Sequence, residues 1–466
     1  MRRERADVAV VGAGPAGLSA AIEAARSGLD VVVIDENPAA GGQIFRQLPA
    51  SFSATAPHKL GRDHARGQQL LSDALSLPIR FFLETTVWGC FEQHVLELST
   101  AESAFQLGAR AVVVAAGAHD RPVPLPGWTL PGVLTIGGVQ LLLKSQRLLA
   151  GRRFLLAGTG PLLLVVASQL AEAGADIAAV VEPVPTRALV GHAAALLRAP
   201  SLMRDGLVYR FNLLRRGIPW IAPAVLLRID GGQEVERATI VEADEDWRPR
   251  PGTERSFDVD TVCVGYGLVP SVELLRLCGC VLRYDTLADA WVPERSADFE
   301  TSVPGIYAVG DGARVAGAVV AADEGRVAGL AAAQALRALS PVDAVLRAAP
   351  ARQRLARLAS FRQAMDAAFR IRPGLHELAE AETVVCRCEE VRVRDVTAAI
   401  HDGARALNQV KCWTRAGMGP CQSRMCAVPT AHIFARGTGM AIPALGSYTT
   451  RPPIKPIPVA ALLHES

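Results

Sequence analysis

Four cysteines near the C-terminus have the paired spacing of metal ligands. Cys386 and Cys388 lie in "CRCEE", and Cys421 and Cys426 lie in "CQSRMC", which gives the pattern C-x-C-x32-C-x4-C. Four thiolates suit either a 2Fe–2S cluster or a structural zinc ion. Because the thiols fall into two pairs, the pattern favours a metal centre over four unrelated buried cysteines.

The segments around these cysteines can bring the two pairs together. Residues 393–417 have the apolar spacing of two short amphipathic helices separated at Gly403. A flexible loop with Gly417, Gly419 and Pro420 can wrap a metal centre while its backbone N–H groups face inward. Cys421 is then expected at the N-terminus of a helix, where the helix dipole favours the thiolate.

The remaining cysteines show no comparable pattern. The chain has nine cysteines and no export signal, so we expect reduced thiols or ligands rather than disulfides. Cys278 and Cys280 form a C-G-C pair without further ligands nearby, which favours a structural role. Cys412 lies within a predicted helix and outside the paired pattern, so we interpret it as a packing residue.

The N-terminal stretch "VAVVGAGPAGLSAA" has the glycine spacing of a dinucleotide-binding loop. Gly12 allows a tight turn after a strand, Gly14 lets the backbone approach a pyrophosphate, and Gly17 lets helix and strand pack closely. Pro15 and Ala16 begin a helix whose N-terminus can hold phosphates through free N–H groups.

The residues after this loop support the same interpretation. A predicted helix from Pro15 to Ser27, closed at Gly28, leads into the strand "LDVVVID". Asp35 ends that strand, where a carboxylate can bond ribose hydroxyls, and Glu36 is the alternative ribose ligand. A glycine-rich turn in an ordinary α/β protein is the less favoured alternative.

A second, weaker loop of the same kind occurs within residues 152–182. Gly158 and Gly160 take the places of the first two glycines, but Leu163 stands where the third belongs and crowds the helix against the strand. Glu182 closes the following strand and would favour NAD over NADP if a nicotinamide nucleotide binds. A degenerate domain retained as a scaffold is at least equally favoured, so NAD(H) is an optional ligand.

Two such units predict an α/β fold in which the first nucleotide-binding domain is interrupted by the second, followed by a small helical domain with the four cysteines. The expected boundaries are 1–145 and 263–337 for the first domain, 146–262 for the second, 338–380 for a helical linker, 381–440 for the cysteine domain and 441–466 for a proline-rich tail. The arginines of residues 348–374 are expected on the solvated face of the linker helix. The tail should be extended, either as a loose terminus or as a strap across another domain or subunit.

Several separated motifs, in this order, resemble the two-dinucleotide flavoprotein oxidoreductases over residues 1 to about 335. "GGQ", with Gly42 and Gln43, resembles the segment that those proteins lay along the flavin, and "VVVAAG", ending at Gly117, resembles their mid-chain strand. "GIYAVGDGA" resembles the strand whose aspartate, here Asp311 beside Gly310, bonds the ribityl chain. The helix after "DEGRVAG" would then point at the flavin. The resemblance implies that the first domain binds FAD.

The cysteine region is similar to 2Fe–2S domains of the bacterioferritin-associated ferredoxin type, although those usually end in C-x-x-C. The wider C-x4-C form with "GMGPCQ" resembles the FAD-containing alpha-type subunits of opine oxidase, hydrogen cyanide synthase and the dye-linked proline and hydroxyproline dehydrogenases. The segments "LPGWTLPGVLTIGGVQ" and "RPPIKPIPVAAL" resemble the same subunits. The resemblance therefore spans nearly the whole chain and implies a 2Fe–2S cluster on the four cysteines.

This resemblance implies an FAD-dependent oxidoreductase that acts as the electron-transfer subunit of a heteromeric dehydrogenase or oxidase. A partner subunit with its own flavin would oxidise an amino acid, imino acid or opine, and electrons would leave toward a respiratory or dye acceptor. A small ferredoxin-like subunit is a further expected partner. We find no acid–base pair for substrate chemistry and assign no catalytic residue. His119 could approach the flavin, but we interpret it as a solvated loop histidine.

Two alternatives stay open. One is a stand-alone NADH:acceptor oxidoreductase, favoured by the second nucleotide-type unit and disfavoured by Leu163. The other is a non-redox assembly subunit that holds structural zinc on the four cysteines.

Composition excludes some other classes of partner. Lys plus Arg (49) nearly balance Asp plus Glu (46), and aromatic residues make up only 5%, so no nucleic-acid surface is indicated. Asp7 interrupts the apolar stretch after "MRRER", so we expect no signal peptide. Every long apolar run meets a charge before the roughly 18 residues that a membrane span needs. We expect a cytoplasmic protein whose attachment to the inner face of a membrane, if any, is made through partners.

Overall fold

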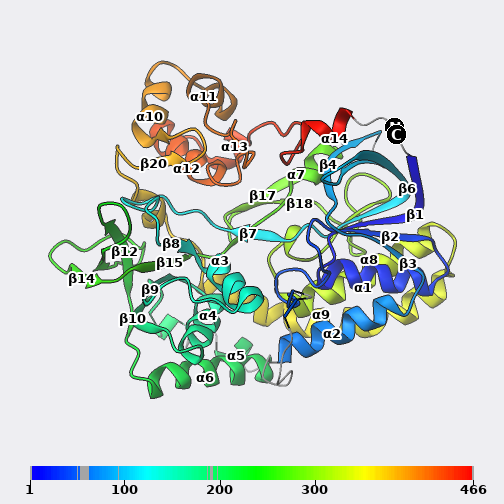
Figure 1. Cartoon of the computed structure of the whole chain (residues 1–466), viewed down its shortest axis with the longest axis horizontal. Coiled ribbons are helices and arrows are strands. Elements are labelled where there is room, and N and C mark those ends of the chain that lie inside the picture. The colour runs from blue at the N-terminus through cyan, green and yellow to red at the C-terminus, as the bar shows by residue number, and fades with distance from the viewer. Residues whose placement is uncertain are drawn as a thin grey trace.

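The structure is a computed structural model that describes residues 3–49, 51–52, 62–92, 94–185, 187–188, 191, 193–196 and 198–463. Two α/β units form most of the molecule, and a smaller helical unit with the four paired cysteines lies at one end (Figure 1). Among the described helices, none is long and apolar enough to cross a membrane.

The first sheet carries the N-terminal glycine loop at the end of a central strand. Parallel strands follow in the order β3, β2, β1, β6 and β19, and β5 and β4 extend the sheet in antiparallel pairing. The strands are β1 (Arg3–Val11), β2 (Val31–Ile34), β3 (Ile79–Phe82), β4 (Thr86–Phe91), β5 (Val95–Ser99), β6 (Ala104–Val114) and β19 (Ile306–Ala308). The strand–turn–helix–strand unit expected at the start of the chain is confirmed, because α1 (Pro15–Arg26) joins β1 to β2.

The helices over this sheet pack unusually closely because glycines lie where they meet. A Cβ atom on Gly325 of α8 (Ala318–Ala335) would lie 2.0 Å from the carbonyl oxygen of Ala16 in α1. One on Gly329 would lie 2.4 Å from the carbonyl oxygen of Ala20. The expected helix start after "DEGRVAG" is wrong, since residues 323–329 lie inside α8. A further helix, α2 (Arg62–Leu75), also contacts α1.

The long helix α9 (Pro341–Ala368) is tied to the first unit along its length. Arg354 bonds the buried carboxylate of Asp323 at 2.6 and 2.9 Å, and Arg362 donates to the carbonyl oxygen of Val315. The solvated face expected for the linker arginines is therefore wrong at Arg362, whose side chain is only 20% exposed, whereas Arg354 stays 45% exposed.

The second sheet contains five parallel strands in the order β11, β10, β9, β15, β8. These are β8 (Val133–Thr135), β9 (Arg153–Gly158), β10 (Asp176–Val181), β11 (Trp220–Ile221) and β15 (Thr261–Gly265). The antiparallel strands β12 (Ala224–Asp230), β13 (Arg237–Glu242) and β14 (Arg255–Asp258) pack beside them. This sheet includes β8 and all of β15. Judged by strand pairing, the second unit therefore begins before residue 146 and ends after residue 262, the expected limits.

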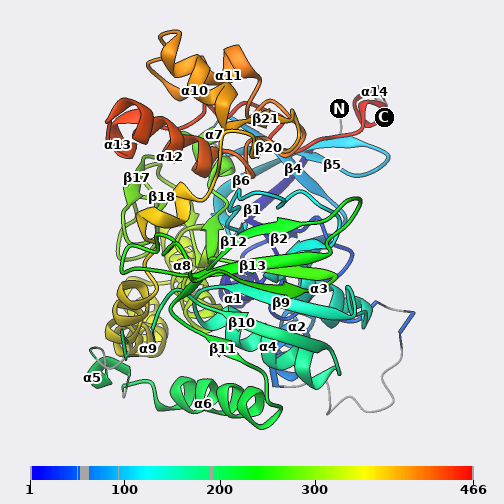
Figure 2. The same cartoon turned by 90° about the vertical axis from the view of Figure 1, so that its left-hand side faces the viewer.

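The helices of the second unit lie on its outer side. They are α4 (Pro161–Glu172), α5 (Ala193–Leu196) and α6 (Pro200–Arg215), while α3 (Ile136–Leu141) continues into a π-helical turn at Leu142–Gln146. Helix α6 packs against α4 and lies far from the cysteine unit in both views (Figures 1 and 2).

Short elements join the units. The strand β7 (Ala118–Asp120) pairs with β16 (Leu268–Pro270), and α7 (Glu273–Leu277) leads to the hairpin of β17 (Leu282–Asp285) and β18 (Ala290–Pro293). This group lies between the first sheet and the cysteine unit (Figure 1).

The cysteine unit has its own buried core. It consists of β20 (Val384–Cys386), β21 (Val391–Arg392), α10 (Val393–His401), α11 (Leu407–Thr414), α12 (Ala427–Thr438) and α13 (Ile442–Leu445). The two short helices predicted around Gly403 are confirmed as α10 and α11. The packing role expected for Cys412 is wrong, because this residue is exposed on α11.

The C-terminal tail forms a strap across the first unit. After α13 it has no regular structure until α14 (Val459–Leu463). The N–H of Ile454 donates to the carbonyl oxygen of Trp88 in β4 at 2.9 Å, and the Ile454 side chain is buried in the core of the first unit. Of the two alternatives for the tail, the strap is the one that the structure contains.

Candidate functional site

The N-terminal glycines form a cradle that side chains would fill. A Cβ atom on Gly12, whose φ is +103°, would lie 2.3 Å from the carbonyl oxygen of Ala115. One on Gly17 would lie 1.8 Å from the carbonyl oxygen of Gly12. Gly14 is the N-cap of α1 and Pro15 its first residue, so the free N–H groups of the helix face the loop.

The "GGQ" segment lies directly against this loop. A Cβ atom on Gly42, at φ +61°, would come within 2.8 Å of the Cα of Gly14. The neighbouring Gln43 is exposed and accepts a hydrogen bond from Arg46. The structure therefore brings together two segments that the sequence separates by about thirty positions.

The carboxylate of Asp35 holds the loop in place. Its Oδ2 accepts a hydrogen bond from the N–H of Ala13 at 2.7 Å, and its Oδ1 accepts from the N–H of Asn37 at 2.8 Å. Glu36 lies at the surface and pairs with Lys455 of the strap. Of the two expected ribose ligands, Asp35 is the one at the loop.

The other flavin-type residues converge on the same place from distant parts of the chain. A Cβ atom on Gly312 would lie 2.8 Å from the N of Gly117, and one on Gly310 would lie 2.8 Å from the Cβ of Ala16. Asp311 accepts hydrogen bonds from the N–H groups that lead into α8, at 2.7 and 2.9 Å. These contacts place the predicted flavin-binding segments beside the glycine loop that precedes α1.

The second glycine loop is hydrogen-bonded to a side chain of the protein, that of Glu182. The carboxyl group of Glu182 accepts hydrogen bonds from the N–H of Gly160 at 3.0 Å and from the hydroxyl of Thr159 at 3.4 Å. Burial raises the pKa of Glu182 to about 7. The ring of Phe369, at the end of α9, lies 3.9 Å from where a Cβ on Gly160 would be. Both Gly158, whose added Cβ would lie 2.1 Å from a backbone oxygen, and Leu163 are fully buried.

The four paired cysteines meet across their unit. The thiol of Cys426 hydrogen-bonds to Cys386, and the thiols of Cys388 and Cys421 are in the same kind of contact. A Cβ atom on Gly419 would lie 2.2 Å from the Cβ of Cys388, so only glycine lets the loop approach. Glycine is therefore needed at position 419 because the loop packs closely against Cys388.

Hydrogen bonding favours the thiolate form of one of the four cysteines, Cys386. The hydrogen bond from Cys426 and backbone N–H groups, including that of Gly417, lower the pKa of Cys386 to about 6. The same contact and burial raise the pKa of Cys426. The expected helix position is wrong for Cys421, because α12 begins at Ala427 and Cys426 is its N-cap.

His119 connects the two candidate cofactor sites. It lies two residues after Gly117, in β7, and it lines the same cavity as Arg424, which falls between the last two cysteines. Its Nδ1 atom is buried and has no hydrogen-bond partner among the described residues. Burial lowers the pKa of His119, so the ring is held neutral. The solvated loop histidine expected from the sequence is therefore wrong.

Other contacts join the cysteine unit to the rest of the chain. Arg276 donates to Ser447, while Trp128 donates from its ring N–H to the carbonyl oxygen of Val384 at 2.7 Å. A cavity of about 750 Å³, counted with its open mouth, lies between α7 and α12. His119, Glu273, Arg276 and Arg424 line it with polar groups.

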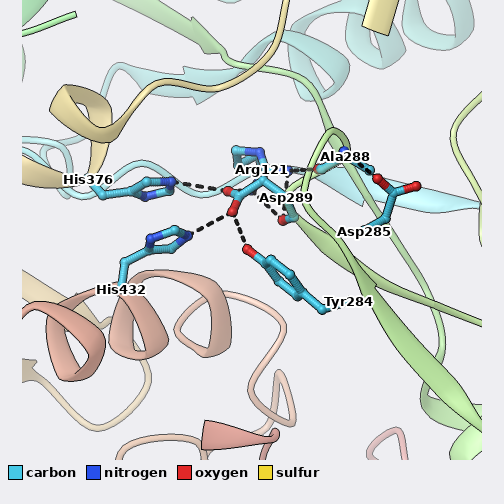
Figure 3. A network of polar contacts seen from close by, with 7 residues as sticks. All are labelled: Arg121, Tyr284, Asp285, Ala288, Asp289, His376 and His432. Atoms are coloured by element: carbon cyan, nitrogen blue, oxygen red, sulfur yellow. Dashed lines mark hydrogen bonds and ion pairs between the residues drawn. The ribbon is translucent and has the colours of Figure 1, made fainter. Parts of the chain in front are cut away.

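A second junction centres on one buried carboxylate (Figure 3). Asp289 accepts hydrogen bonds from Arg121 at 2.8 Å, His376 at 3.1 Å, His432 at 2.9 Å and the hydroxyl of Tyr284. Arg121 and the hydrogen bonds from the two histidines hold the pKa of Asp289 well below its usual range, against the effect of burial. Because these partners come from the first unit, the linker and α12, the network joins three parts of the chain.

This network is the one group of three possible metal ligands, within the described part of the chain, whose donor atoms lie within 4.8 Å of one another. The carboxylate already accepts four hydrogen bonds, one of them from a guanidinium, so we assign it a structural role. Sequence analysis missed it because Asp289, His376 and His432 are isolated in the sequence and follow no motif.

Comparison with known proteins gives matches over nearly the whole chain. A model of the pyridine nucleotide-disulphide oxidoreductase family matches residues 6–325, and a model of the sarcosine oxidase A3 domain matches residues 380–465. The A subunit of opine oxidase from Agrobacterium tumefaciens is 35% identical over 98% of this chain and 91% of its own length. Hydrogen cyanide synthase subunit HcnB of Pseudomonas aeruginosa is 35% identical over 97% of both chains.

Solved structures share the fold at lower identity. The L-proline dehydrogenase of P. horikoshii superposes with a TM-score of 0.70 and 20% identity, covering 100% of this chain and 81% of that one. The thioredoxin reductase of T. acidophilum superposes with a TM-score of 0.53 and 20% identity, covering 72% of this chain and 99% of that one.

Proposed function

Because the chain belongs to the pyridine nucleotide-disulphide oxidoreductase family, we propose that it is the electron-transfer subunit of a heteromeric amino-acid, imino-acid or opine dehydrogenase. It is an FAD-dependent oxidoreductase, and relatives at 35% identity are named as subunits of opine oxidase and hydrogen cyanide synthase. To these findings the proposal adds a 2Fe–2S cluster, a direction of electron transfer and a set of partner subunits.

FAD is held, in this proposal, by the cradle around α1. The backbone at Gly12, Gly14 and Gly17 would face the pyrophosphate, and Asp35 would reach a ribose hydroxyl while it holds the loop. Gly42 and Gln43 would lie along the flavin, and Gly117 with Asp311 would border it. The glycine positions support this assignment, since a Cβ at Gly12, Gly17 or Gly42 would collide with backbone atoms.

The pairing of the four cysteines supports a cluster with two metal ions over a single zinc ion in this proposal. Around one zinc, with Zn–S bonds of about 2.3 Å, all four sulfur atoms would lie within about 4 Å of each other. No three of these sulfur atoms lie within 4.8 Å of one another, and they form the pairs Cys386–Cys426 and Cys388–Cys421. Each pair would hold one iron of a 2Fe–2S cluster.

The contact between His119 and Arg424 carries the proposal. When bound, FAD takes up two electrons and releases them singly, while a 2Fe–2S cluster carries one at a time. His119 lies two residues after Gly117, on the flavin side, and its ring lies beside the cysteine loop at Arg424. It would fix the spacing between the two sites.

The substrate would be oxidised elsewhere, on a partner subunit that carries its own flavin. A small ferredoxin-like subunit and a respiratory or dye acceptor complete the proposed complex, in the cytoplasm.

Metal analysis tests the proposal directly. Iron, zinc and acid-labile sulfide should be measured on anaerobically purified protein, with an EPR spectrum after dithionite reduction. About two irons and two sulfides per chain with a reduced-cluster signal are expected. The Cys421→Ser variant should lose both, whereas Cys412→Ser, at an exposed position of the same unit, should keep them. One zinc and no signal would instead support the structural-zinc alternative.

A stand-alone NADH:acceptor reductase is the second candidate, favoured by the nucleotide-type fold of the second unit. Phe369 opposes it, because its ring lies 3.9 Å from where a Cβ atom on Gly160 would be. NADH should therefore fail to bleach the flavin under anaerobic conditions. Rapid bleaching would make this second candidate the better one.

A further inference from the structure

Helix α6 exposes an apolar stripe on the side facing away from the second unit. Leu207, Phe211 and Leu214 are 64%, 61% and 69% exposed, and they recur at spacings of four and three residues. Residues at i, i+4 and i+7 lie on one face of an α-helix. Val208 extends the stripe at its edge and is also exposed.

The opposite face of α6 fixes the helix to the protein. Leu213 is fully buried, and the amide of Asn212 donates to Glu172 of α4 at 3.1 Å. Arg210 stacks over Trp220, with its guanidinium carbon 4.5 Å from the ring centre. The stripe is therefore presented outward by a helix that is held along its inner face.

Positive charge borders the stripe. Arg204, Arg215 and Arg216 are exposed on α6 and at its end, and the one acidic residue of the helix, Asp205, lies 3.8 Å from Arg204. An exposed apolar stripe flanked by arginines is complementary to a phospholipid surface, whose headgroups are anionic above an apolar layer.

The location of α6 argues against the dehydrogenase partner as the molecule that covers the apolar stripe. Helix α6 and the cysteine unit lie at opposite ends of the molecule in both views (Figures 1 and 2). A subunit that exchanges electrons with this chain must dock near its cofactor sites, which this face does not border.

We propose that this face of α6 docks the protein peripherally on an anionic phospholipid surface. Leu207, Phe211 and Leu214 enter the boundary between headgroups and acyl chains, and Arg204 and Arg215 contact lipid phosphates. The protein then needs no partner to reach a membrane, contrary to the expectation from its sequence. The inference is argued from α6, and only the exclusion of the dehydrogenase partner as the occupant rests on the proposed function.

Vesicle flotation of the purified full-length protein tests this proposal. The protein should float with vesicles of equimolar phosphatidylcholine and phosphatidylglycerol but not with phosphatidylcholine alone, and added salt should weaken binding. Replacing Leu207, Phe211 and Leu214 together by Ser should reduce the bound fraction by about tenfold. Replacing Arg204 and Arg215 by Gln, which leaves the apolar stripe intact, should also reduce it.

Helix α9 offers a matched control. Val342, Val345 and Leu346 are 68%, 66% and 65% exposed at helical spacing, and the adjacent Arg347 is bound to Glu23. Their triple replacement by Ser should leave flotation unchanged, and flavin content should show that every variant is folded.

Two outcomes would overturn the proposal. One is a wild-type protein that does not float, and the other is an α9 variant that loses binding as strongly as the α6 variant. In the first case, light scattering identifies the occupant, because an oligomer that only the α6 variant dissociates would make this face an interface between protein chains.

Discussion

The imidazole rings of His376 and His432 stack face to face, with centroids 3.4 Å apart and planes inclined by 9°. One ring belongs to the segment after α9 and the other to α12, and both donate to the carboxylate of Asp289. The stack therefore attaches the cysteine unit to the first unit through polar groups that a single carboxylate holds together.

The first prediction concerns the charge at this attachment. Asp289→Asn removes the acceptor charge beside the buried guanidinium of Arg121 and should lower the free energy of unfolding by about 3 kcal/mol. Chemical denaturation followed by circular dichroism measures this change. Glu382→Gln, at an exposed ion pair of the cysteine unit, should leave the free energy of unfolding almost unchanged. Equal effects of the two variants would rule out a special role for Asp289.

The second prediction concerns pH. Burial lowers the pKa of His376 from 6.5 to about 4, so the folded state binds fewer protons than the unfolded state between these values. The stability contributed by the neutral ring is complete above about pH 6.5 and is lost as the pH falls toward 4. The unfolding temperature should fall across this window. In His376→Gln the fall should be smaller, and an unchanged profile would contradict the assignment.

The third prediction concerns the FAD cradle. Gly42→Ala places a Cβ within 2.8 Å of the Cα of Gly14 and strains a positive φ, so FAD affinity should drop by about tenfold or more. Titration of the apoprotein with FAD measures the change. Gly108→Ala, where an added Cβ meets nothing within 4 Å, should bind FAD normally. Normal binding by both variants would remove Gly42 from the site.

The fourth prediction concerns the cysteine loop. Gly419→Ala would put a methyl group 2.2 Å from the Cβ of Cys388 and should displace the loop that carries Cys421. Metal content per chain should fall to a small fraction of that of the wild type. Gly206→Ala, in α6 and free of contacts, should keep its full metal content. Retention of metal by Gly419→Ala would show that the loop tolerates the shift.

The fifth prediction tests the junction. His119→Ala should leave FAD and iron content unchanged while it slows reduction of the cysteine-bound centre by about tenfold, since its loss loosens the contact with Arg424. Rapid-freeze EPR after reduction of the flavin follows this step. His401→Ala, at an exposed position on α10, should behave as the wild type. An unchanged rate in His119→Ala would remove the residue from the pathway.

Local patterns allowed the nucleotide-type loops and the helices around Gly403 to be predicted, because turn chemistry and apolar periodicity act over a few residues. The glycine loop at Gly12 and α1 follow directly from such signals. The cysteine spacing likewise indicates a shared centre from local pattern alone. Its loop geometry did not follow, since the start of α12 after Cys426 depends on packing within the unit.

Contacts between distant parts of the chain determine the roles of residues that no local sequence pattern predicts. Arg362 looks like a solvated helix residue until Val315 is placed opposite it, and His119 looks like a loop residue until Arg424 arrives from about three hundred positions away. Asp289 acquires its role only when His376 and His432 come together. No local pattern encodes such pairings.

The strap at Ile454 means that the cysteine unit is tethered at both of its ends, by α9 before it and by the return to Trp88 after it. Attachment at both ends opposes the swing that a carrier arm makes between a donor and an acceptor. Under the proposed function, electrons would therefore cross a fixed gap between the two sites, at a rate that does not depend on solvent viscosity.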